Sequence, residues 1–143
     1  MERRSLILAA ALLLFTGLSA QAETVIEQRQ AAFKQIKESM SAVKDQLKSP
    51  DFGVARTNAV QVVDNAKAVT ELFPEGSYEG DTRAKKKIWK NLEDFQARQQ
   101  QLIANAEALV AATQSGDKKR LKSAFKTVSK DCKGCHMRYR QVF

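Results

Sequence analysis

Apolar residues that recur at steps of three and four positions constrain the fold of this 143-residue chain more than any other feature. From position 25 the pattern runs through four segments with charged residues between the apolar ones, as in amphipathic helices. Three breaks separate these segments: SPDFG at 49–53, FPEGSYEGD at 73–81 and SGD at 115–117. Proline and glycine end helices, and no stretch alternates with period two over a useful length. The sequence therefore predicts an all-α chain of four helices.

The breaks give the expected extent of each helix. The apolar stripes cover 25–47 in the first helix, 55–72 in the second and 121–139 in the fourth. We expect the third helix, the longest, to start at about Thr82 and to end at Gln114.

The first 22 residues, MERRSLILAAALLLFTGLSAQA, have the features of a secretory signal peptide. Two arginines precede an apolar run from Leu6 to Phe15, and the small-residue pattern AQA follows at 20–22. The run is about half as long as a membrane-spanning helix requires, so we do not expect an integral membrane protein. We expect residues 1–22 to be removed on export to the periplasm. Residues 23–143 then form one domain, large enough to bury a single core.

The mature chain is basic. Cleavage removes Arg3, Arg4 and Glu2, so the formal charge of +8 becomes +7. Such a domain can meet acidic proteins or anionic surfaces, and export disfavours nucleic acid as a partner. The simpler interpretation is that lysines coat exposed helix faces. AKKKIWK at 84–90 is the densest basic stretch.

DCKGCHMRYR, residues 131–140, holds both cysteines and the only histidine of the chain. Cys132 and Cys135 continue the apolar stripe of the fourth helix, and His136 lies one turn after Cys132. The three side chains therefore face the same space, and a histidine beside two cysteines requires a chemical explanation.

Three of the four chemistries that use such a cluster fit poorly. A structural zinc site needs four ligands, and this chain offers three. A thioredoxin-type redox pair lies at the start of a helix that follows a strand, whereas this pair lies late in a helix. A disulfide between residues three apart closes too small a loop to restrict the unfolded chain much.

Covalent haem attachment accounts for every residue of the cluster, because C-x-x-C-H is its signature. The thiols of Cys132 and Cys135 add across the two vinyl groups of the porphyrin, and His136 supplies an axial ligand to the iron. The motif occurs by chance in proteins, but here it is the whole cysteine and histidine content of an exported helical chain. The sequence therefore predicts one covalently attached haem c.

The motif lies in the last of four helices, and in this the sequence resembles the class II c-type cytochromes, the cytochrome c′ family in particular. The resemblance covers essentially the whole mature chain and rests on EQRQAAFKQI, FPEGSYEGDTRAKKKIW and CKGCHMRYR. It implies an antiparallel up-down-up-down bundle of four helices. Lys86 departs from the family, in which many members have proline at this point, and the departure shifts the expected start of the third helix slightly.

The resemblance also implies which polar residues surround the haem. Arg29, together with Gln30, matches the contact to the haem propionates, a charge-assisted pairing. Thr82 or Arg83, at the end of the longest loop, adds a second such contact. Arg140, one turn after the histidine, matches the basic residue of the proximal side, although a solvated terminal arginine fits the sequence equally well.

Phe33 matches the family's position over the distal face of the haem. Phenylalanine does not coordinate iron, so we expect a five-coordinate, high-spin haem that binds nitric oxide or carbon monoxide. Phe33 offers no hydrogen bond to bound oxygen, which disfavours oxygen storage. By resemblance, the family is associated with nitric oxide binding and with electron transfer. The alternative is a low-spin electron-transfer cytochrome in which Met40 is the sixth ligand. Met40 lies about 10 Å further along the helix axis, at about 1.5 Å per residue, and fits a core methionine better.

Other expectations concern assembly and activity. Val60 and Val63 lie off the main stripe of the second helix, and relatives often pair through their first two helices, so we expect a homodimer. Trp89, Phe95 and Phe125 either wall the haem or belong to the core. We expect no enzymatic activity, because no second acid–base group lies over the iron and no substrate pocket is evident.

Overall fold

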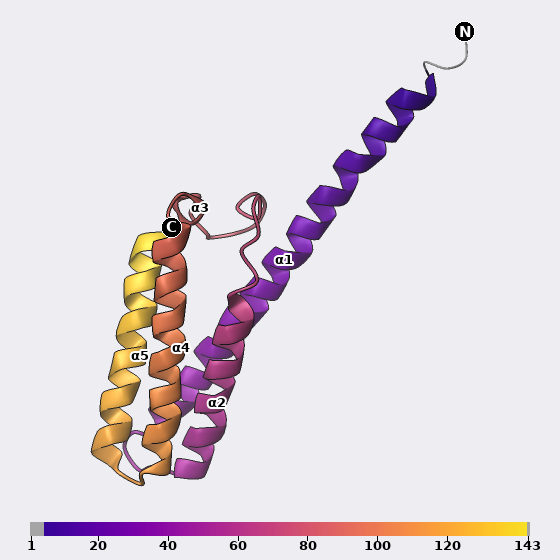
Figure 1. The fold of residues 1–143 in the computed structure, drawn as a ribbon. Coiled ribbons are helices and arrows are strands. Elements are labelled where there is room, and N and C mark those ends of the chain that lie inside the picture. The colour runs from indigo at the N-terminus through magenta and orange to yellow at the C-terminus, as the bar shows by residue number, and fades with distance from the viewer. Residues whose placement is uncertain (1–4, 143) are drawn as a thin grey trace.

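The computed structural model describes the backbone of residues 5–142 and the side chains of residues 24–142. The predicted signal peptide, residues 1–22, lies outside the residues whose side chains are described. Within the described chain the helices are α1 (Ser5–Asp45), α2 (Phe52–Val69), α3 (Lys87–Lys90), α4 (Leu92–Gln114) and α5 (Lys118–Tyr139) (Figure 1). The predicted all-α fold is confirmed.

The four long helices follow one another in space as they do in sequence. α1 packs on α2, α2 packs on α4 and α4 packs on α5 in an antiparallel bundle (Figure 1). Short turns join α1 to α2 and α4 to α5, whereas a long loop that carries α3 joins α2 to α4. Contacts between α1 and α5 are few by comparison. The seam between these two helices is therefore the least tightly packed side of the bundle.

Capping side chains set the starts of two helices where the sequence breaks predict them. The Asp51 carboxylate accepts a hydrogen bond from the Val54 amide at 3.0 Å at the start of α2. The Asp117 carboxylate accepts one from the Lys119 amide at 2.7 Å at the start of α5. Gly116, with φ of 65°, supplies the left-handed residue that lets α4 end and the chain turn.

The expected start of the third helix at about Thr82 is wrong. The chain forms the single turn α3, breaks at Asn91 with φ of −138°, and begins α4 at Leu92. The cause is tertiary pairing of the preceding segment with the end of α5. The Lys85 amide donates to the Tyr139 carbonyl at 2.9 Å, and the Gln141 amide donates to the Arg83 carbonyl at 2.8 Å. This short ladder holds the backbone extended where a helix is expected.

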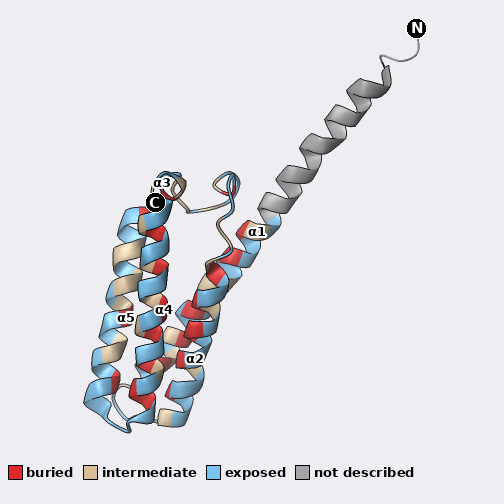
Figure 2. Ribbon diagram, viewed as in Figure 1, coloured by how far each residue is buried: buried red, intermediate tan, exposed pale blue. Residues whose placement is uncertain are grey.

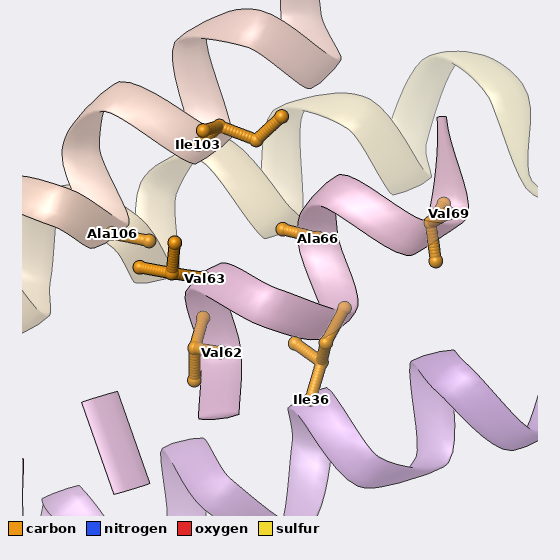
Figure 3. Packing of buried hydrophobic residues seen from close by; sticks show 7 residues of the cluster. All are labelled: Ile36, Val62, Val63, Ala66, Val69, Ile103 and Ala106. Carbon is orange, nitrogen blue, oxygen red and sulfur yellow. The ribbon is translucent and has the colours of Figure 1, made fainter. Parts of the chain in front are cut away.

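The core consists of apolar faces turned inward from all four long helices (Figure 2). One cluster joins α1, α2 and α4, and its side chains project into the spaces between these helices (Figure 3): Ile36, Val62, Val63, Ala66, Val69, Ile103 and Ala106. A second cluster nearer the opposite end comprises Val43, Ala55, Ala59, Leu109, Leu121 and Val128. The expectation that Val63 lies off the buried face is wrong, because this residue is only 7% exposed and belongs to the first cluster.

In the part of the chain that the structure describes, no helix combines the length and the apolar content that crossing a bilayer requires.

Candidate haem-attachment site

The α5 helix places the cysteines on the side that faces the bundle. Leu121, Val128 and Tyr139 are buried along this face, and the two thiols lie half-buried between them. Both thiols are free, as haem attachment requires. The predicted stripe of the fourth helix is therefore confirmed.

The local environment keeps both thiols protonated. Desolvation, with the Asp131 carboxylate as the next cause, raises the pKa of Cys132 to about 11. Desolvation also raises the pKa of Cys135. A redox-active cysteine of the thioredoxin type needs a lowered pKa, so these thiols do not fit that alternative.

A narrow apolar cavity lies beside Cys135 and reaches across the bundle to α1. Residues of all four long helices line it: Phe33, Ile36, Ala66, Val69, Phe95, Arg98, Gln99, Leu102, Asp131 and Cys135. The expected distal residue and one expected attachment residue thus border the same space, beside the loosely packed seam between α1 and α5.

Phe33 and His136 lie opposite each other across this seam. Their ring centroids are 6.4 Å apart with an interplanar angle of 66°. Desolvation, with the nearby Arg140 guanidinium as the second cause, lowers the pKa of His136. The imidazole is therefore neutral at pH 7, which is the form that ligates a metal.

Arg29 is buried, and its guanidinium holds the loop between α2 and α3. One terminal nitrogen donates to the Leu72 carbonyl at 3.1 Å and to the Ser77 hydroxyl at 3.3 Å. The other donates to the Ser77 carbonyl and to the Thr82 hydroxyl, both at 2.9 Å. The guanidinium also lies over the Phe73 ring, 4.6 Å from its centroid. Arg29 thus organises the loop, because both of its terminal nitrogens donate to loop residues.

The other polar residues expected around the haem lie at the same end of the bundle. The Gln30 side-chain amide donates to the Asp81 carbonyl at 2.7 Å, which is a second link between α1 and the loop. Thr82 accepts from Arg29, and the Arg83 carbonyl takes part in the ladder with the end of α5. Arg140 is the residue bridged to Ala84, and its side chain is exposed. The propionate contacts of these residues stay predictions.

The aromatic residues expected near the haem lie in three different places. Phe95 is buried and lines the cavity, whereas Phe125 packs in the second core cluster. Trp89 lies against Tyr78, with ring centroids 5.1 Å apart, and its indole nitrogen donates to the Pro74 carbonyl at 2.9 Å. Trp89 therefore stabilises the loop between α2 and α3.

Sequence reasoning missed one polar cluster on the proximal side, which joins α4 to the end of α5. The Asp94 carboxylate accepts hydrogen bonds from Arg98 at 3.0 Å and from the Tyr139 hydroxyl, and it pairs with Arg138 at 3.1 Å. Hydrogen bonds from Arg98 and then from Tyr139 lower the pKa of Asp94 to about 2. The four-residue spacing of Asp94 and Arg98 was the only signal in the sequence, since the contacts to α5 require the fold.

These residues fit a covalently bound haem. Covalent binding of a porphyrin requires two free thiols, a histidine ligand for the iron and apolar surroundings. The site offers two free thiols three positions apart, a neutral imidazole next to them and an apolar cavity bordered by aromatic rings. Cys132 and Cys135 would hold the macrocycle, and His136 would ligate its iron.

Comparisons with known proteins agree with this assignment. The family model described as "Cytochrome C'" matches residues 24–140. A cytochrome c-556 from Agrobacterium tumefaciens (strain B2A) is 35% identical over 118 residues, which cover 80% of this chain and 95% of that protein.

Two solved structures have the same fold. Cytochrome c′ from Shewanella frigidimarina superposes with a TM-score of 0.81 at 37% identity and covers 85% of this chain and 97% of its own. A nitric oxide complex of a mutant cytochrome c′ from Alcaligenes xylosoxidans superposes with a TM-score of 0.77 at 27% identity, with the same coverage. The chain therefore belongs to the cytochrome c′ family, whose proteins carry one covalently attached haem c.

Proposed function

We propose that this protein is a periplasmic cytochrome whose five-coordinate haem binds nitric oxide or carbon monoxide and exchanges single electrons. The observation that carries the proposal is the position of Phe33, whose ring lies 6.4 Å from the ring of His136 and lines the apolar cavity. An aromatic ring in this place keeps water and strong ligands from the iron and still leaves room for a small neutral gas when it moves aside.

Each residue of the site has a separate task in this proposal. Cys132 and Cys135 tether the cofactor, which an exported protein would otherwise lose by dilution. His136 supplies the proximal ligand, and Arg140 lies close enough to this imidazole to lower its pKa. The haem iron, when bound, supplies the site at which a diatomic molecule coordinates. Phe33 controls access to that site and donates no hydrogen bond to the ligand.

The alternative, a low-spin cytochrome with Met40 as the sixth ligand, has less support. Met40 packs against both core clusters and is absent from the lining of the cavity, which is the environment of a core methionine. Gas binding has independent support in the nitric oxide complex formed by a mutant of the Alcaligenes cytochrome c′.

An absorption spectrum of the purified protein in both redox states tests the proposal. We expect a predominantly high-spin ferric spectrum, and a ferrous spectrum that changes on addition of carbon monoxide. Met40→Leu should leave both spectra unchanged, because leucine replaces a packed thioether at a cost below about 1.5 kcal/mol in stability. A low-spin wild-type spectrum that Met40→Leu converts to a high-spin one would establish Met40 as the sixth ligand and overturn the proposal.

The attachment and the export are tested separately. Haem staining after denaturing electrophoresis should keep the colour with the polypeptide, and the intact mass should correspond to a chain that begins at Glu23 and carries one haem. Retention of residues 1–22 in protein recovered from the periplasm would contradict the predicted cleavage.

A further inference from the structure

The outer face of α5 carries a row of lysines that the haem site does not use. Lys122, Lys126, Lys130 and Lys133 follow one another at steps of four, four and three, and all four are exposed. At about 100° per residue they fall within an arc of roughly 80° on the helix surface. We call these four residues the lysine stripe.

The charge of the lysine stripe is not balanced within the molecule. Among the described residues, no ion pair joins any of the four to a carboxylate, whereas Lys34 and Lys67 on other helices have acidic partners at 4.0 and 2.7 Å. The only acidic residue of α5 is Asp131, which is half-buried and accepts a hydrogen bond from Asn105 at 2.7 Å. Like charges four positions apart repel each other along a helix, so the lysine stripe is unfavourable for the isolated fold.

The stripe leads to the haem-attachment turn. Met137, four positions after Lys133 and adjacent to His136, is 69% exposed and lies at the end of the same face of α5. Two further basic residues accompany this methionine: the Lys85 ammonium donates to the Met137 backbone carbonyl at 3.4 Å, and the exposed Arg140 follows three positions later. An apolar centre with a charged rim is the usual composition of a protein docking surface.

We propose that the lysine stripe and Met137 form the docking surface for an acidic redox protein that exchanges one electron with the haem. This inference rests on the electron exchange in the proposed function. In the exchange the iron passes from ferrous to ferric as the acceptor centre of the partner gains one electron, and no bond is made or broken. Complementary charge accelerates such an encounter, and the exposed methionine lets the two proteins meet close to the attached cofactor.

An anionic membrane fits this surface less well than an acidic protein. A helix that lies on a bilayer buries its apolar face in the lipid, but the apolar face of α5 is turned into the bundle, where Leu121 and Val128 are fully buried and Phe125 is half-buried. Within α5 Met137 is the one large apolar side chain that is exposed, and that is too little for stable membrane binding.

The test uses cupric plastocyanin, a small acidic blue-copper protein, as the electron acceptor. Stopped-flow absorbance would follow oxidation of the ferrous holoprotein at low and at high ionic strength. We expect Lys126→Glu with Lys130→Glu to lower the second-order rate constant about tenfold at an ionic strength of about 10 mM, and the difference to vanish at high salt. These positions lie outside the CxxCH motif, and glutamate is as good a helix former as lysine, so haem attachment and folding should be preserved.

The matched control is Lys37→Glu with Lys44→Glu on α1, which changes the net charge equally at exposed lysines away from the stripe. Equal decreases of the second-order rate constant in the two double variants would show that only net charge matters. That result would overturn the proposal of a docking surface. Co-sedimentation of the wild-type protein, but not of the stripe variant, with phosphatidylserine vesicles would assign the surface to a membrane and overturn it as well.

Two further measurements separate this inference from the proposed function. Oxidation by the small cation tris(phenanthroline)cobalt(III) should not slow in the stripe variant, because the haem itself is intact. Carbon monoxide binding should be the same in the wild-type protein and in both double variants. Failure of the wild type to bind carbon monoxide would contradict the proposed gas chemistry and leave the docking comparison valid.

Discussion

Phe33 is the residue on which the proposed gas chemistry depends, because in that proposal it controls access to the distal side. In Phe33→Ala a ligand no longer has to displace an aromatic ring, so carbon monoxide and nitric oxide should associate faster, and oxygen should gain access. Replacing a fully buried phenylalanine by alanine lowers the free energy of unfolding by roughly 3–5 kcal/mol. Phe33 is half-buried, so the loss should be smaller. Flash photolysis of the carbon monoxide complex measures the rates, with Phe33→Leu as the control of intermediate size. Unchanged association rates in Phe33→Ala would show that Phe33 does not cover the iron.

Single residues were predictable where their chemistry is local in sequence. Cys132, Cys135 and His136 stand within five positions, so their spacing alone indicated the cofactor. Arg29 was identified by resemblance, but its partners were not, because the Leu72 carbonyl and the Ser77 backbone become neighbours only when the loop folds back on α1. Hydrogen bonds to backbone atoms leave no pattern of residue types to recognise.

At the level of helices, Asp94 connects α4 to the end of α5 and makes the stability of the fold depend on pH. Its pKa is about 2 in the folded protein, against an ordinary value of 3.8, so the folded state favours the carboxylate. The resulting stabilisation is complete above about pH 4 and disappears as the pH falls toward 2. Asp94→Asn should therefore lower the melting temperature at pH 7. It should also make the melting temperature fall less steeply between pH 4 and pH 2. Thermal unfolding followed by circular dichroism over this range measures both effects.

Glu93→Gln is the matched control for this prediction, because it removes a neighbouring exposed carboxylate that, among the described residues, has no ion pair with α5. Glu93→Gln should follow the wild-type dependence on pH. An Asp94→Asn profile identical to that of the wild type would show that the cluster adds nothing to stability.

The extent of the helices was predictable only where local signals act. Asp51 and Asp117 cap α2 and α5 through their own side chains, and the sequence marks both positions. The start of the third helix was predicted too early because residues 83–85 pair with residues 139–141, more than 50 positions away in the chain. A helical preference at Ala84 and Lys85 is weak beside two backbone hydrogen bonds to another segment.

For the whole molecule, the open question is whether two copies associate. Val63 is part of the core, but Val60 and Val54 are 36% and 42% exposed on α2, so this helix still presents an apolar surface. We predict a homodimer through this face, and Val60→Lys should shift the equilibrium toward monomer by placing like charges opposite each other. Sedimentation velocity at tens of micromolar measures the change. Ala111→Lys, at an exposed position of α4, is the control. A wild-type protein that sediments as a monomer would contradict the prediction.

The loop between α2 and α3 is attached at both of its ends to helices that barely touch each other. Arg29 and Gln30 hold it to α1, and the ladder of residues 83–85 with 139–141 holds it to the end of α5. α1 carries the lid residue Phe33, and α5 carries His136. The loop therefore links the two helices that, in the proposed function, face the two sides of the haem. A gas ligand that displaced Phe33 and α1 outward would also pull, through this loop, on the segment that follows His136.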